Sequence, residues 1–103
     1  MQQRPLGNTG LNVSALSFGC GAVGGLMTRG APADQERAVA RALDAGITYF
    51  DTAPQYGLGT SEENIGHIFA KLKPKVALGT KVRLTEADYS RAGAAIAASC
   101  DAS

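Results

Sequence analysis

Apolar positions recur at helical spacing in two long segments of the chain. Residues 31–45 carry Val39 on such a stripe, and residues 61–73 carry Ile65 and Ile68. Polar and charged side chains occupy the positions between them. Because an apolar stripe with a period near 3.6 residues is typical of a helix packed on a core, the pattern predicts two amphipathic helices.

The ends of the helices are marked by residues with known end preferences. Gly46 follows the first predicted helix as a stop signal, and Pro74 ends the second. Ser61 is expected to cap the start of the second helix. Thr85 is expected to cap a third helix that runs to about Cys100.

Short apolar runs alternate with these helices and predict strands. The expected strands cover residues 17–19, 47–50 and 76–80. Residues 1–16 contain two extended pieces around the turn residues 7–10, which predicts a β-hairpin. The order is therefore a hairpin followed by βαβαβα, an α/β arrangement in which parallel strands carry helices outside them. No linker divides residues 1–103, so we expect a single domain.

Composition narrows the possible functions. The formal net charge of +1 gives no support to nucleic-acid binding. No apolar run is long enough to span a bilayer, and the N-terminus lacks the apolar core of a signal peptide, so we expect a cytoplasmic protein without a membrane partner. Cys20 and Cys100 lack metal-ligand spacing and are expected to be free thiols, with no metal site.

Three polar residues near the ends of the predicted strands form a chemically coherent set. Asp51 follows one strand, Lys81 follows the next, and Tyr56 lies five residues beyond Asp51. Since parallel strands gather their carboxyl ends on one face, these side chains are expected to converge. Hydride reduction of a carbonyl leaves an alkoxide that needs a proton. A tyrosine can donate it when an ammonium favours the phenolate and a carboxylate holds that ammonium in place.

A glycine-rich loop allows a second interpretation. Residues 19–24 match the G-x-G-x-x-G fingerprint of a Rossmann-type dinucleotide-binding module, and Asp51 supplies the acidic residue after the next strand. In that motif the last glycine already lies in the helix. Here the predicted helix begins only after Pro32, which argues against the match.

Several motifs together resemble the aldo-keto reductase superfamily. They are residues 50–57 (FDTAPQYG), Ser61-Glu62 with Gly66, residues 79–81 (GTK), and the N-terminal stretch RPLGNTGLNVS. The resemblance implies that the chain is the N-terminal part of a (β/α)8 barrel, in which residues 17–103 form the first three β/α units. It also implies reduction of an aldehyde or ketone, or oxidation of an alcohol, with NADP(H) or NAD(H).

The resemblance assigns roles to individual residues. Asp51, Tyr56 and Lys81 match three members of the family's Asp-Tyr-Lys-His catalytic tetrad. Gly19, Cys20 and Gly21 are expected beside the cofactor, and Asp51 is expected to contact its nicotinamide ribose region.

The fourth member of the tetrad has no counterpart in the sequence. The family's histidine follows a fourth barrel strand, whereas His67 lies within the second predicted helix and is expected on its surface. A closed barrel typically takes about 250 residues. Three strands leave two open edges, so we expect a truncated form with little turnover. The alternative is a non-catalytic fragment that associates through those edges.

Overall fold

A computed structural model describes all 103 residues. The elements in chain order are β1 (Gln3–Pro5), β2 (Asn12–Ser14), β3 (Phe18–Gly19), α1 (Leu26–Arg29), α2 (Pro32–Asp44), β4 (Tyr49–Asp51), α3 (Thr60–Leu72), β5 (Ala77–Gly79), the 3-10 helix η1 (Glu86–Arg91) and α4 (Ala92–Ala102). The predicted hairpin, three strands and three helices are all present. The one-turn helix α1 was not predicted.

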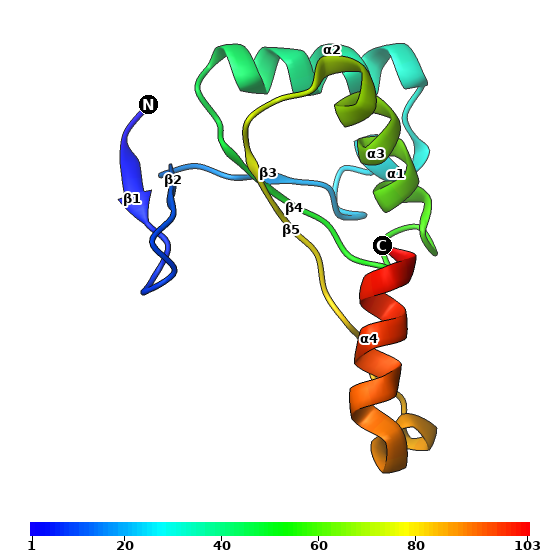
Figure 1. Ribbon diagram of the computed structural model, residues 1–103. Coiled ribbons are helices and arrows are strands. Elements are labelled where there is room, and N and C mark those ends of the chain that lie inside the picture. The colour runs from blue at the N-terminus through cyan, green and yellow to red at the C-terminus, as the bar shows by residue number, and fades with distance from the viewer.

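The N-terminal hairpin is an antiparallel pair that is fastened to the amino end of the sheet. Strands β1 and β2 pair with Arg4 opposite Val13. The backbone N–H of Ser14 donates to the hydroxyl of Thr48, and the backbone N–H of Thr48 donates to the hydroxyl of Ser14, both at 2.9 Å. Since Thr48 immediately precedes β4, this exchange fixes the hairpin at the end opposite the strand exits (Figure 1).

The core sheet has three parallel strands in the order β3-β4-β5. Phe50 of β4 pairs with Phe18 on one side and with Leu78 on the other. Parallel strands in consecutive order require a crossover helix between them, and α2 and α3 fill those places. Figure 1 shows both helices on the same side of the sheet.

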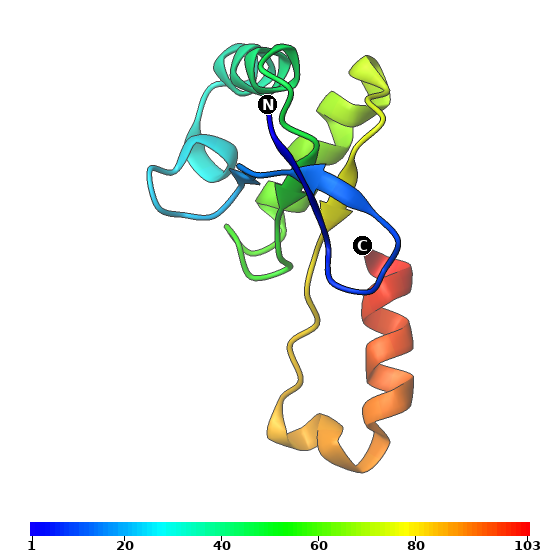
Figure 2. The same ribbon diagram turned by 90° about the vertical axis from the view of Figure 1, so that its left-hand side faces the viewer.

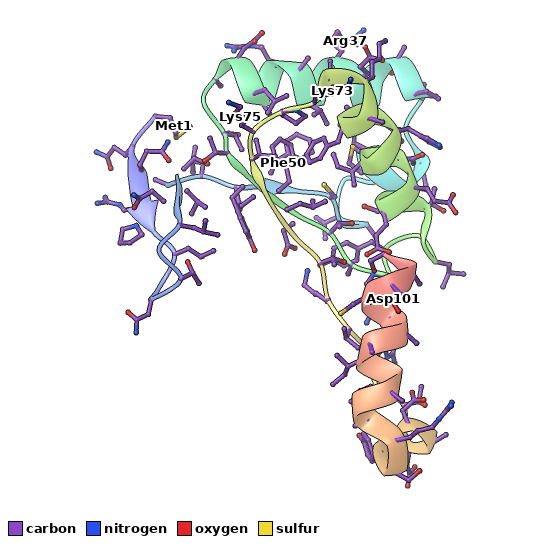
Figure 3. The ribbon with its side chains drawn as sticks, viewed as in Figure 1. Met1, Arg37, Phe50, Lys73, Lys75 and Asp101 are labelled. Atoms are coloured by element: carbon purple, nitrogen blue, oxygen red, sulfur yellow. The ribbon has the colours of Figure 1, made fainter.

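Helices α2 and α3 bury the helix-facing side of the sheet. Phe50 lies between them and the strands and is fully buried (Figure 3). Its ring packs against Phe18 at 5.3 Å and edge-on against Phe69 at 5.2 Å between ring centroids. The predicted apolar stripes supply Val39, Ile65 and Ile68 to the buried cluster, whose other members are Cys20, Met27, Ala42 and Phe50.

Glycine residues mark one end of α2 and one end of α3, whereas only one of the two predicted side-chain caps is present. Gly46 has φ +87° and its N–H bonds the carbonyl of Leu43, which confirms it as the stop after α2. Helix α3 begins at Thr60 with Gly59 as its N-cap, so the prediction that Ser61 caps this helix is wrong. Thr85 caps the third helix, as predicted, and does so through a capping box with Asp88, but the first turns that follow are 3-10 rather than α-helical.

Helix α4 projects away from the sheet and packs little. Figure 2 shows it extending away from the strands. It contributes no buried residue, and its alanine-rich sequence has no well-defined apolar face. Its C-terminal end returns toward the start of α3 (Figure 1), where Ser103 and Glu62 line the same shallow hollow. No helix in the structure combines the length and the apolar character that crossing a membrane requires.

The sheet has two unpaired edges and one face without helices. Strands β3 and β5 are the edge strands, and Leu78 on β5 is half-exposed at 47%. Unpaired parallel strands with apolar side chains favour association. Association through these edges stays a prediction. On the face away from the helices, Tyr49 lies across Gly79 of the neighbouring strand.

The contact between Tyr49 and Gly79 predicts that Gly79→Ala lowers the free energy of unfolding. A Cβ at position 79 would lie 3.1 Å from Cζ of Tyr49, and closer to the hydroxyl. Either the ring or strand β5 must shift, which typically costs about 1–3 kcal/mol. Urea unfolding followed by circular dichroism measures the change.

Gly66→Ala is the matched control for this substitution. Gly66 is exposed within α3, and an added Cβ would meet nothing within 4 Å. Because alanine is favoured over glycine in a helix, this variant is expected to gain about 0.5–1 kcal/mol. Equal effects of the two substitutions would contradict the strand packing described here.

Candidate functional site

The carboxyl ends of the three parallel strands lie in register and bring their exit loops together. Asp51 at the end of β4 pairs with Gly19 of β3 and with Gly79 of β5. The loop after β4 carries Tyr56, and Lys81 lies two residues beyond the end of β5. The predicted convergence of Asp51, Tyr56 and Lys81 is therefore present in the structure.

Asp51 and Lys81 form a two-pronged ion pair. The Lys81 ammonium donates to both carboxylate oxygens of Asp51, at 2.9 and 2.8 Å. The side chains are 35% and 44% exposed respectively. Because exposed ion pairs contribute about 1 kcal/mol or less to stability, the main consequence of the pair is the position of the ammonium.

Two further oxygens surround the ammonium of Lys81. It donates to the carbonyl of Thr52 at 2.9 Å and to the hydroxyl oxygen of Tyr56 at 3.3 Å. It also lies 4.9 Å from the centroid of the Tyr56 ring. The hydrogen bond with Asp51, and to a lesser extent that with Tyr56, raises the pKa of Lys81 above its usual 10.5, so the group is charged at neutral pH.

Tyr56 is held from two directions. Its backbone N–H bonds the carbonyl of Ala53 at 3.1 Å, and its own carbonyl accepts the N–H of Ser61 at 3.2 Å. Its ring lies against Gly21, where an added Cβ would sit 3.6 Å from the ring carbons. The phenol therefore lies between the loop after β3 and the ammonium of Lys81.

Gly19, Cys20 and Gly21 lie on the same face, but the side chain of Cys20 points into the core. Cys20 is fully buried, and this desolvation is the main reason that its pKa is raised from 9.0 to about 11. Only the backbone of Cys20 can meet a ligand. Gly19 has open space above it, and the predicted cofactor contacts of these three residues stay a prediction.

Four polar residues of this region were not identified as functional from the sequence. Ser61 and Thr52 share a buried hydroxyl–hydroxyl bond of 2.8 Å, and the Ser61 hydroxyl donates to the carbonyl of Cys20 at 2.8 Å. The hydroxyl of Thr80 donates to the carboxylate of Glu62. These bonds join positions that are between 9 and 41 residues apart, so no local spacing indicates them.

The strand-exit face is open rather than hollowed. None of the hollows in the structure is lined by Asp51, Tyr56 or Lys81. The largest, of about 430 Å³, lies at the opposite end of the sheet, between the hairpin and the amino ends of β4 and β5. His67 is exposed on α3, as predicted, beside a hollow between α2 and α3. No cluster of three His, Cys, Asp or Glu side chains is arranged to hold a metal ion.

The geometry of the glycine-rich loop overturns the Rossmann interpretation. Gly24 and Gly25 both have left-handed backbones, with φ of +78° and +73°, and lie outside any helix. The helix that follows, α1, has only four residues. A dinucleotide fingerprint instead places its last glycine inside a long helix whose N-terminus meets the pyrophosphate.

Comparison with known proteins identifies a family. The family model described as "Aldo/keto reductase family" matches residues 15–103. Pyridoxal 4-dehydrogenase of Microbacterium luteolum is 38% identical over 81 residues, which are 79% of this chain and 24% of that protein. D-threo-aldose 1-dehydrogenase of a Pseudomonas species is 48% identical over 67 residues, 64% of this chain and 20% of the relative.

A solved structure supports the same relationship. The holo form of an aldo-keto reductase from Bacillus halodurans superposes with a TM-score of 0.68 and 32% sequence identity. The match covers 84% of this chain and 28% of that chain. The chain thus spans about a quarter of the length of the proteins that it matches.

The burial of Cys20 predicts a large difference in reactivity between the two thiols. At pH 8 a chromogenic disulfide reagent is expected to label one thiol rapidly, the exposed Cys100, and to label Cys20 only after unfolding. Since folding raises the pKa of Cys20 from 9.0 to about 11, its contribution to stability is complete below pH 9 and is lost as the pH rises through 11.

The variant Cys100→Ser isolates the buried thiol. It should show no rapid labelling when folded and one equivalent of thiol in guanidinium chloride. Rapid labelling of folded Cys100→Ser would mean that Cys20 is accessible and that the loop after β3 is placed differently.

Proposed function

We propose, because this chain belongs to the aldo-keto reductase family, that it provides the proton-donating part of an NAD(P)-dependent oxidoreductase site for a small carbonyl or alcohol. The observation that carries the proposal is a single ammonium, that of Lys81, which is bonded to both Asp51 and Tyr56. The full catalytic activity is also part of the proposal, since the matched segments cover only 24% and 28% of the pyridoxal dehydrogenase and of the Bacillus halodurans reductase.

The role of Tyr56 is to give a proton to the oxygen of the substrate. Tyr56 is partly buried at the strand exits, and the ammonium nitrogen of Lys81 lies 3.3 Å from its hydroxyl oxygen. As the proton leaves, negative charge grows on the phenol oxygen, and the fixed ammonium stabilises it. The substrate oxygen takes up the proton and becomes a hydroxyl, and the opposite transfer operates in alcohol oxidation.

Asp51 acts by holding Lys81 rather than by exchanging a proton itself. Its two bonds to the ammonium fix the position of that group and keep it charged, which a lysine on a flexible stem would not do alone. The carbonyl of Thr52 adds a third fixed acceptor. The charge is therefore in place before the substrate binds, as electrostatic catalysis requires.

The residues on this face fit a nicotinamide cofactor. A bound reduced nicotinamide supplies the hydride that carbonyl reduction needs. Gly19 leaves open space beside the strand ends, Gly21 presents bare backbone next to Tyr56, and Asp51 keeps a partly exposed carboxylate. These are the residues that would hold the nicotinamide end. The proposal includes both NADP(H) and NAD(H), because the residues named here would contact only the nicotinamide end, which the two nucleotides share.

Titration of the purified chain with NADPH and with NADH tests the proposal. Saturable binding, followed by the fluorescence of the reduced nicotinamide, is expected for at least one nucleotide. Lys81→Met removes the ammonium at the centre of the site while keeping an unbranched apolar stem, and should weaken binding by tenfold or more. This loss corresponds to about 1.4 kcal/mol or more.

Lys75→Met is the matched control, because it removes one positive charge at the far end of the sheet (Figure 3). It should leave nucleotide binding unchanged. Equal losses in Lys75→Met and Lys81→Met would mean that only net charge matters. Absence of binding by a folded wild-type chain would contradict the assignment of this face.

A further inference from the structure

The first turn of α3 touches the exit of every strand in the core sheet. Ser61 bonds the carbonyl of Cys20, which follows β3, and the hydroxyl of Thr52, which follows β4. The next residue, Glu62, accepts the hydroxyl of Thr80, which follows β5. One helical turn thus reaches three segments that are far apart in the sequence.

Ser61 anchors this turn in the interior. Its side chain is fully buried, and Thr52 is 1% exposed. Because buried hydroxyls without partners are costly, the bonds among Ser61, Thr52 and Cys20 define where the turn can lie. The hydroxyl of Ser61 is turned toward the strands and not toward the free N–H groups of its own helix, so it is not used as a cap.

Glu62 extends the contact to the segment that carries Lys81. Strand β5 is an edge strand, and the chain from Thr80 onward leaves the sheet without regular structure up to η1. An irregular segment next to an open edge has many accessible conformations. The bond from Thr80 to Glu62 restrains the residue directly before Lys81.

We propose that Glu62 is a positioning residue, which holds the exit of β5 through Thr80 and so keeps the Lys81 ammonium on Asp51 and Tyr56. Glu62 itself bonds neither Asp51 nor Tyr56. Its effect is transmitted along the backbone from position 80 to position 81. An effect of Glu62 on catalysis rests on the proposed function. Its effect on the position of the Lys81 ammonium does not.

The titration of Lys81 measures this role directly, without any nucleotide. Nitrogen-15 NMR of the ammonium follows its midpoint. The ionisable groups that interact with it are Asp51, Tyr56 and the buried thiol of Cys20. Beside Glu62 lie Glu63 and the C-terminal Ser103. In the wild type the midpoint is expected above 10.5, because the bond with Asp51 raises the pKa of Lys81.

Three variants separate the hydrogen bond from the charge. Glu62→Ala should return the Lys81 midpoint toward 10.5, because the restraint on Thr80 is lost and Lys81 leaves Asp51 more often. Glu62→Gln keeps an acceptor for Thr80 and should retain the wild-type midpoint. Glu63→Ala, which removes a neighbouring carboxylate from the same turn, should also leave the midpoint unchanged.

Thr80→Val tests the same bond from its other side. It should reproduce the shift seen in Glu62→Ala, and the double variant should shift no further, since both changes remove one interaction. Far-ultraviolet circular dichroism shows that each variant is folded before its titration is compared.

Two results would overturn the positioning role. One is a folded Glu62→Ala chain whose Lys81 midpoint equals that of the wild type. The other is a Glu62→Gln chain that shifts as much as Glu62→Ala, which would make charge the cause. Nucleotide titration distinguishes the two proposals. If the Lys81 midpoint depends on Glu62 but the chain binds neither NADPH nor NADH, only the proposed function is refuted. If the chain binds a nucleotide but the midpoint does not depend on Glu62, only the positioning role is refuted.

Discussion

Two backbone hydrogen bonds at the carboxyl end of β4 set the geometry of the whole site. The N–H of Cys20 bonds the carbonyl of Asp51, and the N–H of Thr52 bonds the carbonyl of Gly79, each at 2.8 Å. They fix the exits of β3 and β5 on either side of Asp51. Asp51 and Lys81 both lie within two residues of these bonds, so a slip in strand register would separate the two charged groups.

The charged residues of the site position one another but contribute little to the stability of the fold. The ion pair between Asp51 and Lys81 is more than a third exposed and contributes little to folding. The core that holds the strands in place is instead apolar, with Phe50 at its centre between the sheet and the two large helices. The chain thus separates the residues that stabilise the fold from those available for chemistry. The strand-exit face is also more open than a ligand pocket, since no hollow encloses it.

Much of this arrangement could be predicted because it follows from local sequence patterns. Apolar periodicity located α2 and α3, and glycine at position 46 located a helix end. Parallel topology was enough to bring together the exits of β4 and β5, and with them Asp51 and Lys81. The family resemblance then supplied roles for residues that spacing alone left open.

The missed features depend on contacts across the fold. Ser61 is a favourable cap by residue type, yet the structure uses its hydroxyl to bond strand exits, and Gly59 takes the cap position. The side chain of Cys20 points into the core, which the residue type alone did not indicate, while its predicted place beside a cofactor stays a prediction. Sequence periodicity does not reveal which buried polar groups meet, because their partners lie up to 41 residues away.

The most direct test of the account is a nuclear Overhauser contact between the Lys81 side chain and the Tyr56 ring in the 103-residue chain. The structure places the Lys81 nitrogen 4.9 Å from the ring centroid, so cross-peaks from the Lys81 methylene protons to the ring protons are expected. Contacts between β4 and β5 serve as the internal control for folding. If those strand contacts appear and the Lys81–Tyr56 contacts do not, the sheet forms without the site, and the central claim is wrong.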